Sequence, residues 1–242
     1  MKKTHFFLLV SFLIFVLVLI SCIGLILLLS PHRRATAKES SEPFCVVIDC
    51  GHGGPDGGAV GADGTAEKDI NLALGFALKA LLEQNGYSVV MTRKDDNFIC
   101  DDHSASLREQ NVSDHHNRLA VAEKYKNSVF VSLHMNKFSD ARYWGAQLFY
   151  SPNHADSKVL SALIRERIIA FVQQGNSREL KEMDSSVYII YHATHPALLL
   201  ECGFMSNREE LEKFKTEKYR SKFAFSVFLG INDYVMQRGK NG

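Results

Sequence analysis

Three apolar runs in this sequence each lead into a side chain that can bind a metal ion or transfer a proton. They are Val46-Val47-Ile48 before His52, Val129 to Leu133 before His134, and Leu198-Leu199-Leu200 before Glu201. If these runs are strands of an open α/β sheet, ligands bind beyond their carboxyl ends. We therefore expect the two histidines and the glutamate to face one crevice.

His52 lies in a glycine-rich loop, D-C-G-H-G-G-P-D-G-G-A-V-G at positions 49–61. No G-K-[ST] follows, so the loop is not a phosphate-cradling P-loop. A dinucleotide fingerprint read from Gly51 would put Asp56 where its last glycine should be, and a carboxylate there would repel a pyrophosphate. The loop is therefore suited to a backbone that closely approaches a neutral or cationic group.

Two histidines and one carboxylate form a known catalytic zinc-ligand set, which leaves one coordination position for water. A further glutamate then serves as general base, taking a proton from water and later protonating the leaving amine. Glu201 follows three leucines, so we expect it to be buried, and buried carboxylates are rare unless they are paired or bound to metal. Glu67 begins a predicted helix, where a favourable interaction with the helix dipole is the alternative role. For His52 and His134 the alternatives are a loop histidine that caps glycine amides and a core histidine, respectively.

Further polar residues lie close to these in the sequence. Candidates for hydrogen bonds to the ligands or for substrate binding are Asp49, Asp56, Asn71 and Asn136. Six other histidines are expected on the surface or in loops: His103, His115, His116, His154, His192 and His195. The motifs G-x-S-x-G and H-E-x-x-H do not occur, so a serine hydrolase or a zincin lacks support.

Strand and helix patterns alternate around these residues. Apolar residues at i, i+3, i+4 and i+7 predict a helix over residues 67–84, and Asn207 followed by Glu210 resembles the capping box of a short helix. The remaining predicted elements are helices over 116–125, 157–172 and 217–237, strands over 44–49, 87–92, 129–133, 146–150, 187–190 and 197–200, and loops over 95–114 and 176–186. This alternation predicts one α/β domain with a mainly parallel sheet flanked by helices.

The N-terminal segment is strongly apolar and carries no charge over residues 6–29. A helix of that length rises roughly 36 Å, enough to span a bilayer core of about 30 Å. We therefore predict a transmembrane anchor over 1–30, a polar linker over 31–43 and a catalytic domain over 44–238. The alternatives are a cleaved signal peptide and a lipoprotein cut site at 19–22. Basic residues flank both sides of the segment, so the positive-inside rule does not decide its orientation.

Composition excludes one class of partner. The formal net charge is +1 and no block of basic residues occurs, so nucleic-acid binding is a poor interpretation. There are five cysteines and no C-x-x-C. Cys45, Cys50 and Cys202 lie in or beside apolar runs, so we expect them to be small hydrophobic residues of the core.

Four motifs resemble those of the zinc N-acetylmuramoyl-L-alanine amidases: D-x-G-H-G-G-x-D-x-G-A (49–59), E-K-D-I-N (67–71), S-L-H-M-N (132–136) and E-C-G-F-M-S-N (201–207). Enzymes of that family cut the amide between the muramic acid lactyl group and the first L-alanine of the peptidoglycan stem. The resemblance covers residue 44 to the C-terminus and implies a compact α/β domain with a six-stranded sheet. It also implies that His52, Glu67 and His134 bind one Zn²⁺ ion per chain and that Glu201 is the catalytic glutamate.

Within the family the sequence is most similar to the spore-cortex, CwlD-type amidases, on the block G-H-G-G-P-D-G-G-A-V-G, on W-G-A-Q-x-F-Y at 144–150 and on the N-terminal anchor. That likeness implies a single-pass membrane protein, held through residues 6–29, whose catalytic domain lies outside the cytoplasmic membrane on the forespore or cortex side. It implies that peptidoglycan stem peptides are removed so that muramic δ-lactam can form for germination, with a lipoprotein as activating partner. Two rival functions are a vegetative amidase for cell separation or wall turnover and a non-catalytic wall-binding scaffold.

Two positions depart from the pattern of the family. Cys50 stands where the family usually has proline, and we expect a simple steric substitute. Tyr191 occupies a slot where many relatives carry arginine. That change puts a substrate contact in doubt and leaves the zinc site unaffected.

Overall fold

The strands of the domain form one mixed sheet. The computed structural model describes residues 14–18, 21 and 43–241, and the chain divides into two units, 1–41 and 42–242. The six strands of the second unit are β1 (Cys45–Cys50), β2 (Ser88–Met91), β3 (Ser128–Asn136), β4 (Gln147–Tyr150), β5 (Lys181–Glu182) and β6 (Ala197–Phe204). Their order in the sheet is β2-β1-β3-β6-β4-β5.

Most neighbouring strands run parallel. β1 pairs in parallel with β2 and β3, and β3 pairs in parallel with β6, whereas β4 is antiparallel to β6. The expected six-stranded, mostly parallel sheet is confirmed. Every residue of β1 is buried, as expected for a parallel strand that is covered on both faces and therefore reads as a continuous apolar run.

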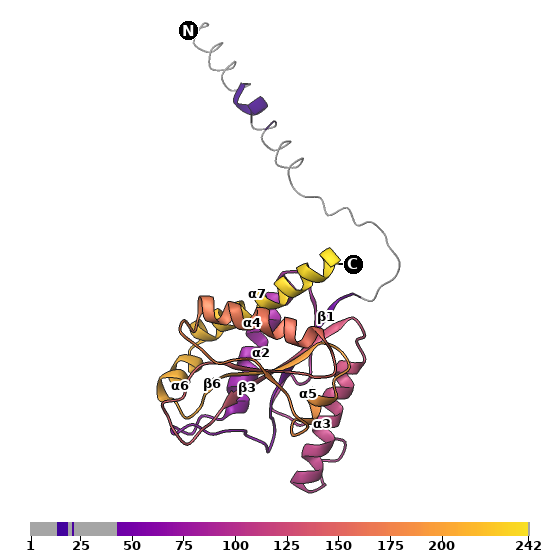
Figure 1. Ribbon diagram of the computed structural model, residues 1–242, viewed down its shortest axis with the longest axis vertical. Helices are drawn as coiled ribbons and strands as arrows, with labels where there is room; N and C mark the ends of the chain where they lie inside the picture. The colour runs from indigo at the N-terminus through magenta and orange to yellow at the C-terminus, as the bar shows by residue number, and fades with distance from the viewer. Residues whose placement is uncertain (1–13, 19–20, 22–42, 242) are drawn as a thin grey trace, which may run out of the picture. The chain divides into compact units, whose positions relative to one another are not determined.

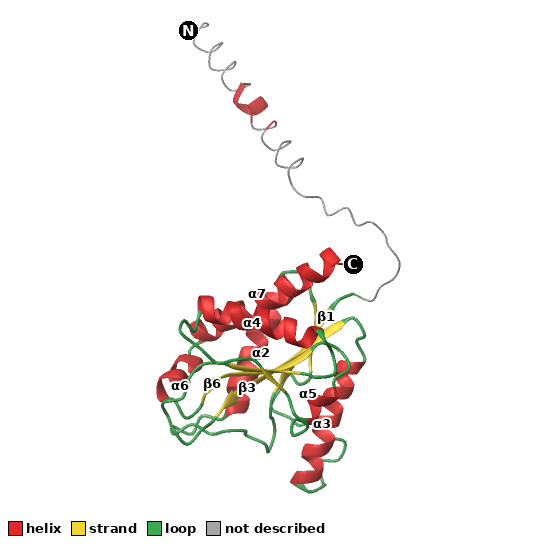
Figure 2. Ribbon diagram, viewed as in Figure 1, coloured by secondary structure: helices red, strands yellow, loops and turns green. Residues whose placement is uncertain are grey.

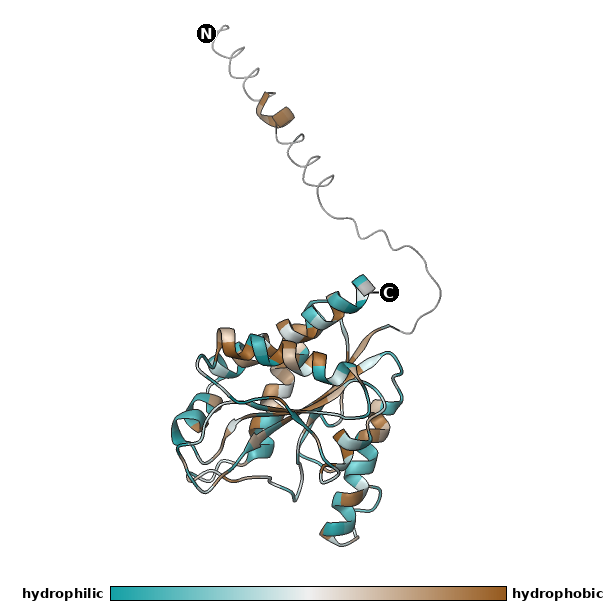
Figure 3. Ribbon diagram, in the orientation of Figure 1, coloured by the Kyte–Doolittle hydropathy of each residue, from teal (hydrophilic) through white to brown (hydrophobic). Residues whose placement is uncertain are grey.

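Helices cover both faces of the sheet (Figures 1 and 2). They are α2 (Glu67–Gln84), α4 (Asp156–Phe171) and α7 (Glu217–Asn241) on one face, α3 (Leu107–Glu123) and α5 (Tyr188–His192) on the other, and α6 (Arg208–Lys215) after β6. Side chains of β1 alternate between the two layers, with Val46 and Ile48 in the larger core cluster and Cys45 and Val47 in the smaller one. Figure 3 shows the resulting concentration of hydrophobic residues along the central strands.

Two helices differ from the sequence-based prediction. α3 begins at Leu107, after a capping box between Ser106 and Glu109, so the last eight residues of the predicted loop 95–114 are helical and the predicted helix 116–125 is too short. The helix was missed because it buries only Asp114, Arg118 and Ala122 and so has no apolar stripe. The predicted strand 187–190 is wrong, since α5 is helical there. A four-residue apolar run does not distinguish a strand from a buried helical turn.

The strands that carry the candidate site are longer than predicted. β3 continues to Asn136 and β6 to Phe204, so His134 and Glu201 lie inside strands and not beyond their ends. The predicted loop 176–186 contains the two-residue β5. The predicted helix start at Asn207 is confirmed, because its side chain accepts a hydrogen bond from Glu210 N at 3.1 Å.

The predicted anchor lies mostly outside the described residues. Its described part, residues 14–18 and 21, is helical. Across the described residues, no helix combines the length and apolar character needed to cross a membrane. The predicted linker 31–43 lies outside the described part of the chain except for its last residue, and so does Cys22.

Close packing of α4 against α7 gives a test of the fold. A Cβ atom on Gly230 of α7 would lie 2.4 Å from Ile164 Cα of α4, so Gly230→Ala must push the two helices apart. We expect the free energy of unfolding to fall by about 1–3 kcal/mol, as for other overpacked sites, despite the better helix propensity of alanine. Urea unfolding followed by circular dichroism measures the change.

Gly239 is the matched control in the same helix, since a Cβ atom there would have no neighbour within 4 Å. Gly239→Ala should leave the unfolding free energy unchanged or raise it by up to about 1 kcal/mol. Equal effects of the two substitutions would contradict the close approach of the helices.

Candidate active site and metal centre

His52, Glu67 and His134 come together at one edge of the sheet. His52 follows β1, Glu67 is the first residue of α2, and His134 lies in β3. Glu67 Oε1 is 3.2 Å from His52 Nε2 and 3.1 Å from His134 Nδ1, and one ligand atom of each residue lies within 4.8 Å of the others. Two imidazole nitrogens and a carboxylate oxygen can hold a divalent metal ion. No second group of this kind occurs in residues 14–18, 21 and 43–241.

The carboxylate of Glu67 is buried and fixed by several donors. Its Oε2 accepts a hydrogen bond from Ala59 N at 2.8 Å, and its Oε1 accepts one from Met135 N at 2.9 Å and one from Asn71 Nδ2 at 3.2 Å. Burial alone would raise the pKa of Glu67, but hydrogen bonds and charge from the two histidines outweigh it and hold the pKa below its usual value. Glu67 is therefore an ionised group in a fixed position.

Asp56 orients His52. Its Oδ2 lies 2.7 Å from His52 Nδ1, and its Oδ1 accepts a hydrogen bond from Gly58 N at 3.0 Å. His52 itself adopts a left-handed backbone conformation, with φ of 63°, which directs Nε2 toward Glu67. Burial opposes protonation of His52, but hydrogen bonds to Asp56 and Glu67 raise its pKa to about 10. The predicted partnership of Asp56 with a candidate ligand is thus present.

Glycine is required where the loop passes the ligands. A Cβ atom on Gly51 would lie 2.2 Å from His134 Cε1, and one on Gly58 would lie 2.7 Å from Glu67 Oε2. No other residue type fits at either position without displacing a candidate ligand. The glycines of this loop therefore make room for the side chains of the candidate ligands, and this role explains them without a bound phosphate.

Asp49 supports the candidate site through its hydrogen bonds to neighbouring residues. It is buried and accepts hydrogen bonds from Arg118 Nη1 at 2.8 Å, Thr92 Oγ1 at 2.6 Å and Ser132 Oγ at 2.7 Å, so the expected bond to a histidine is replaced by bonds to these residues. Burial would raise the pKa of Asp49, but the Arg118 charge and the two hydroxyl donors lower it to about 2. Asp49 thus ties β1 to the neighbouring strands and to α3.

Arg93 and Arg118 are site residues that sequence reasoning missed. Arg118 Nη1 and Nη2 donate to the carbonyl oxygens of Cys50 and His52, each at 2.8 Å. Arg93 donates to the carbonyls of Cys50, Gly51, Asp95 and Lys68 at 2.8–3.1 Å. The only local signal in the sequence was the position of Arg93, directly after the predicted strand 87–92. Both guanidinium groups hold the backbone of the loop that carries His52.

Glu201 lies beside the ligand cluster. It is the register partner of His134 on the adjacent strand, so the two side chains project from the same face. Glu201 as a whole is half-buried. Its Oε2 atom is buried and has no hydrogen-bond partner among the described residues. Burial is the main cause that raises the pKa of Glu201 to about 7. A carboxyl group with that pKa can both accept and donate a proton near neutral pH.

The two asparagines of the predicted set differ in role. Asn71 Nδ2 donates to Gly51 O at 3.2 Å as well as to Glu67, which ties α2 to the loop. Asn136 lies at the end of β3, after a register shift, and its carbonyl accepts a hydrogen bond from Met205 N at 2.7 Å. Asn71 therefore supports a candidate ligand. The hydrogen bond to the carbonyl of Asn136 joins two backbone segments.

Cys45, Cys50 and Cys202 are buried in the core, as predicted, and Cys100 is buried as well. All four of these cysteines are free. The Sγ atom of Cys50 packs against Gly75, and burial, with the nearby charge of Asp49, raises the pKa of this thiol to about 12. Cys50 is thus a steric substitute that remains protonated.

Two further positions lie away from the site. His195 was expected on the surface or in a loop, but it is buried, with Nδ1 3.2 Å from Glu123 Oε1. It precedes β6, at the opposite end of that strand from Phe204, which explains why it does not join the cluster. Tyr191 lies in α5, where its ring contacts His192 with centroids 5.2 Å apart.

The lowered pKa of Asp49 predicts how stability depends on pH. The pKa is about 2 in the folded protein and about 3.9 in an unfolded chain, so the stabilisation is present above pH 4 and is lost as pH falls toward 2. Asp49→Asn should lower the unfolding free energy by about 2–3 kcal/mol at pH 6. Chemical denaturation should show this difference shrinking as the pH approaches 2.

Asp95→Asn is the control, because Asp95 is exposed in the loop that follows β2. It should differ from the original protein by less than about 0.5 kcal/mol at either pH. A gap between Asp49→Asn and the original protein that stays constant down to pH 2 would show that the charge of Asp49 is not what stabilises the fold.

Comparisons with known proteins agree with this geometry. The family model described as N-acetylmuramoyl-L-alanine amidase (Amidase_3) matches residues 46–233. The chain is similar to the CwlD amidase from Clostridioides difficile, solved in complex with the GerS lipoprotein, at 36% identity and a TM-score of 0.76, covering 79% of this chain and 98% of that one. It is similar to the germination-specific N-acetylmuramoyl-L-alanine amidase of Bacillus subtilis at 29% identity over 80% of this chain and 81% of the relative.

A third similar protein is the catalytic domain of CwlV, an N-acetylmuramoyl-L-alanine amidase from Bacillus (Paenibacillus) polymyxa, at 30% identity, a TM-score of 0.67 and coverage of 79% of this chain and 98% of that one. The matched segment includes His52, Glu67, His134 and Glu201. The family match spans most of the chain. The matched segment contains the His52, Glu67 and His134 cluster, which is suited to metal-dependent hydrolysis of an amide. The chain belongs to the Amidase_3 family and is an N-acetylmuramoyl-L-alanine amidase that acts on peptidoglycan.

Proposed function

We propose that this amidase depends on one zinc ion per chain, held by His52, Glu67 and His134, with Glu201 as general base. The observation that carries the proposal is the buried Oε2 atom of Glu201, which has no hydrogen-bond partner in the described part of the chain and lies beside the three candidate ligands. A buried carboxylate oxygen without a donor is costly, and such groups persist where they serve a ligand or a reaction.

The donor set fits zinc. Two imidazoles and a carboxylate suit zinc, and three protein ligands leave room for catalysis. No thiolate competes, because burial raises the pKa of both Cys50 and Cys202. When bound, zinc supplies a Lewis acid that polarises the substrate carbonyl and makes water a better nucleophile at neutral pH.

The residues around the ligands prepare the site for metal. In the metal-free site the pKa of His52 is about 10, so at neutral pH its ring is protonated between Asp56 and Glu67. Binding of a metal at Nε2 requires loss of that proton, so affinity rises with pH. Asp56 holds the Nδ1 side of the ring throughout and keeps Nε2 directed at Glu67.

Glu201 moves protons in this mechanism. As a carboxylate it accepts the proton of the water that attacks the amide carbonyl. It then delivers that proton to the nitrogen of the leaving L-alanine, which breaks the amide bond and restores the carboxylate. A pKa of about 7 suits both directions; burial raises the pKa, and the charge of the two histidines opposes this only in part.

For the biological setting, we infer action on the spore cortex. Support comes from the germination-specific relative of Bacillus subtilis and from the CwlD amidase of Clostridioides difficile. In this setting, residues 6–29 anchor the chain and the catalytic domain lies outside the cytoplasmic membrane. Removal of stem peptides prepares muramic acid for δ-lactam formation, and a lipoprotein partner, like the one bound to the Clostridioides difficile enzyme, activates the reaction.

Substitution of Glu201 separates proton transfer from metal binding. Glu201→Gln keeps the shape of the side chain but cannot accept a proton, so hydrolysis of purified peptidoglycan should fall about 10²–10⁴-fold. Zinc content, measured by inductively coupled plasma mass spectrometry, should remain at one ion per chain. Glu67→Gln removes a candidate ligand and should lose zinc and activity together.

Glu83→Gln is the control, since its side chain is 46% exposed near the end of α2 and should change neither quantity. Zinc lost from the Glu201→Gln protein would make Glu201 a ligand instead of a base. Undiminished hydrolysis after removal of zinc by a chelator would contradict the metal mechanism altogether.

The cortex proposal predicts a defect confined to spores. Cells that lack this protein should form a cortex without muramic δ-lactam, because the stem peptides remain attached. Mass spectrometry of muropeptides from spore cortex and from vegetative walls measures both populations. The original gene should restore the lactam and the Glu201→Gln gene should not. Altered vegetative walls with an unchanged cortex would assign the enzyme to wall turnover.

A further inference from the structure

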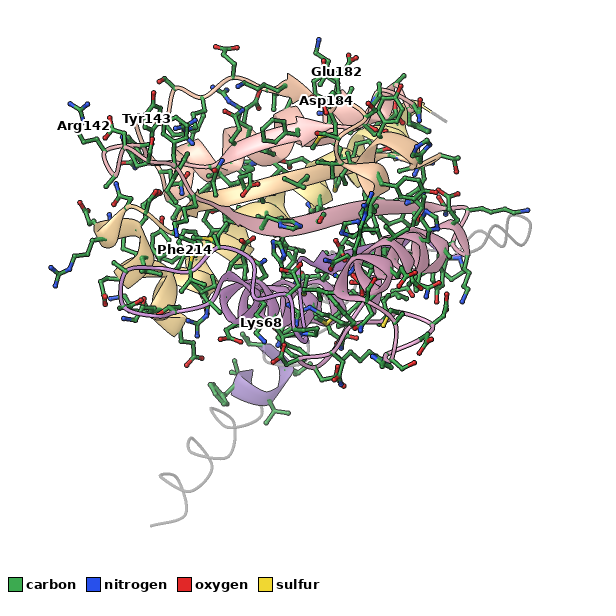
Figure 4. All side chains as sticks on the ribbon, turned by 90° about the horizontal axis from the view of Figure 1, so that it is seen from below. Lys68, Arg142, Tyr143, Glu182, Asp184 and Phe214 are labelled. Atoms are coloured by element: carbon green, nitrogen blue, oxygen red, sulfur yellow. The ribbon has the colours of Figure 1, made fainter. Side chains whose placement is uncertain are left out.

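Three exposed aromatic side chains lie on the loop that joins β3 to β4. Phe138, Tyr143 and Trp144 are 51%, 45% and 42% exposed, although aromatic residues of this size are usually buried. The loop begins directly after β3, which carries His134, and ends at β4. Figure 4 shows Tyr143 next to Arg142 at the outer end of this loop, on the same side of the molecule as Phe214 of α6. We call Phe138, Tyr143 and Trp144 the aromatic platform.

The aromatic platform adjoins the candidate catalytic edge. Gln147, the first residue of β4, is the register partner of Glu201 on β6. Trp144 precedes Gln147 by three residues, which places it within about 10 Å of that pair along the chain. The Tyr143 ring lies 6.1 Å from the ring of Phe204, on the strand that carries Glu201. A ligand long enough to cross the edge can therefore contact both the reacting atoms and the platform.

The loop is rigidly held even though its aromatic rings are exposed. Its backbone is fixed by bonds from Phe138 N to Ser206 Oγ at 3.1 Å, Asn207 Nδ2 to Tyr143 O at 3.2 Å, Arg178 Nε to Trp144 O at 3.0 Å, Gly145 N to Glu210 Oε1 at 3.0 Å and Ala146 N to Gln173 Oε1 at 2.7 Å. Glu210 is itself buried, so these partners are built into the domain. A rigid loop that presents apolar rings to solvent is preorganised for a ligand, since it loses little conformational entropy on binding.

Trp144 separates two hollows of ligand size. One cavity of about 570 Å³ is lined by Asp140, Arg142, Trp144 and Arg178 among others. The other, of about 540 Å³, shares Arg142 and Trp144 and adds Lys213. Volumes of this size are typical of sites for small organic groups.

Two guanidinium groups beside the platform can donate to the hydroxyl and acetyl oxygens of a sugar. The guanidinium of Arg142 is already paired with Asp140, at 2.7–3.1 Å. The guanidinium of Arg178 lies over the rings of Tyr143 and Phe204, 5.4 and 4.6 Å from their centroids. Arg142 is thus paired with a carboxylate, whereas Arg178 is stacked on two rings and donates to Trp144 O. The C–H face of a pyranose ring stacks on the negative face of an aromatic ring, and guanidinium and amide groups bind its hydroxyl and acetyl oxygens.

The geometry points to a subsite for the glycan strand of peptidoglycan at the aromatic platform, with N-acetylated amino-sugar rings stacked on Trp144 and Tyr143. This assignment rests on the amidase function proposed above. The subsite binds the sugar chain next to the muramic acid whose amide is cut. The enzyme should therefore prefer polymeric glycan to free muramyl peptides as substrate.

Trp144 is the only tryptophan of the chain, so its fluorescence reports directly on the platform. The probe is a peptide-free tetrasaccharide of alternating N-acetylglucosamine and N-acetylmuramic acid, titrated into the zinc-loaded full-length protein. We expect a saturable change in tryptophan emission with this probe and none with a free stem peptide that begins with L-alanine. A change produced by the stem peptide but not by the tetrasaccharide would overturn the assignment.

Kinetics on soluble glycan chains that carry stem peptides supply an independent readout. Trp144→Ala should raise KM about tenfold, a loss of about 1.4 kcal/mol of binding, whereas Trp144→Phe keeps an aromatic face and should stay within about threefold of the original enzyme. Phe76→Ala is the matched control, because Phe76 is 43% exposed on the outer side of α2, and it should leave KM unchanged. An unchanged KM for Trp144→Ala would contradict the subsite.

The two proposals fail in different ways. An enzyme that binds the tetrasaccharide but does not cut peptidoglycan would refute the catalytic mechanism and leave the glycan subsite standing. Peptidoglycan cut at the original rate by the Trp144→Ala protein, together with no change in the emission of the original protein on addition of the tetrasaccharide, would refute the subsite alone.

Discussion

The carbonyl oxygen of Cys50 accepts hydrogen bonds from two buried arginines, and the shape of the loop that carries His52 depends on this convergence. Arg93 Nε and Arg118 Nη1 both lie 2.8 Å from that oxygen. Burying a guanidinium is costly unless its donors are satisfied, and here Asp49, Asp114 and a set of loop carbonyls satisfy them. Breaking a buried pair of this kind typically costs about 3–5 kcal/mol. The loop between β1 and α2 therefore keeps one shape, although it is rich in glycine.

That fixed loop explains how two carboxylates a short distance apart acquire opposite properties. Glu67 receives two backbone N–H groups and faces two histidines, which lowers its pKa. The Oε2 atom of Glu201 is buried and receives no hydrogen bond from the described residues, and burial raises the pKa of this carboxyl group. Environments that separate the pKa values of neighbouring carboxyl groups separate their roles. One glutamate is suited to remain an anionic ligand, and the other is suited to exchange a proton.

The mixed sheet extends the site beyond its reacting atoms. Because β4 runs antiparallel to β6, the loop before β4 returns to the same edge that carries His134 and Glu201. Glu210 and Gln173 then hold this loop in place, with the aromatic platform exposed on it. A wholly parallel sheet would have needed a crossover connection at this point and would have moved the loop away from the edge. The reversed direction of β4 thus places the aromatic platform at the edge of the sheet that carries the candidate catalytic residues.

Local patterns in the sequence determined the parts of this protein that depend on near neighbours. The apolar spacing of residues 67–84 predicted α2 with its observed bounds, and apolar runs located the strands that carry His134 and Glu201. The motifs identified the family and its candidate ligands. Tertiary structure alone decided that Arg118 serves the loop at His52, that α3 is long, and that the loop before β4 faces the site. The physical reason is that these features depend on contacts between residues far apart in the chain, and α3, with its mainly polar surface, has no apolar period that would reveal it.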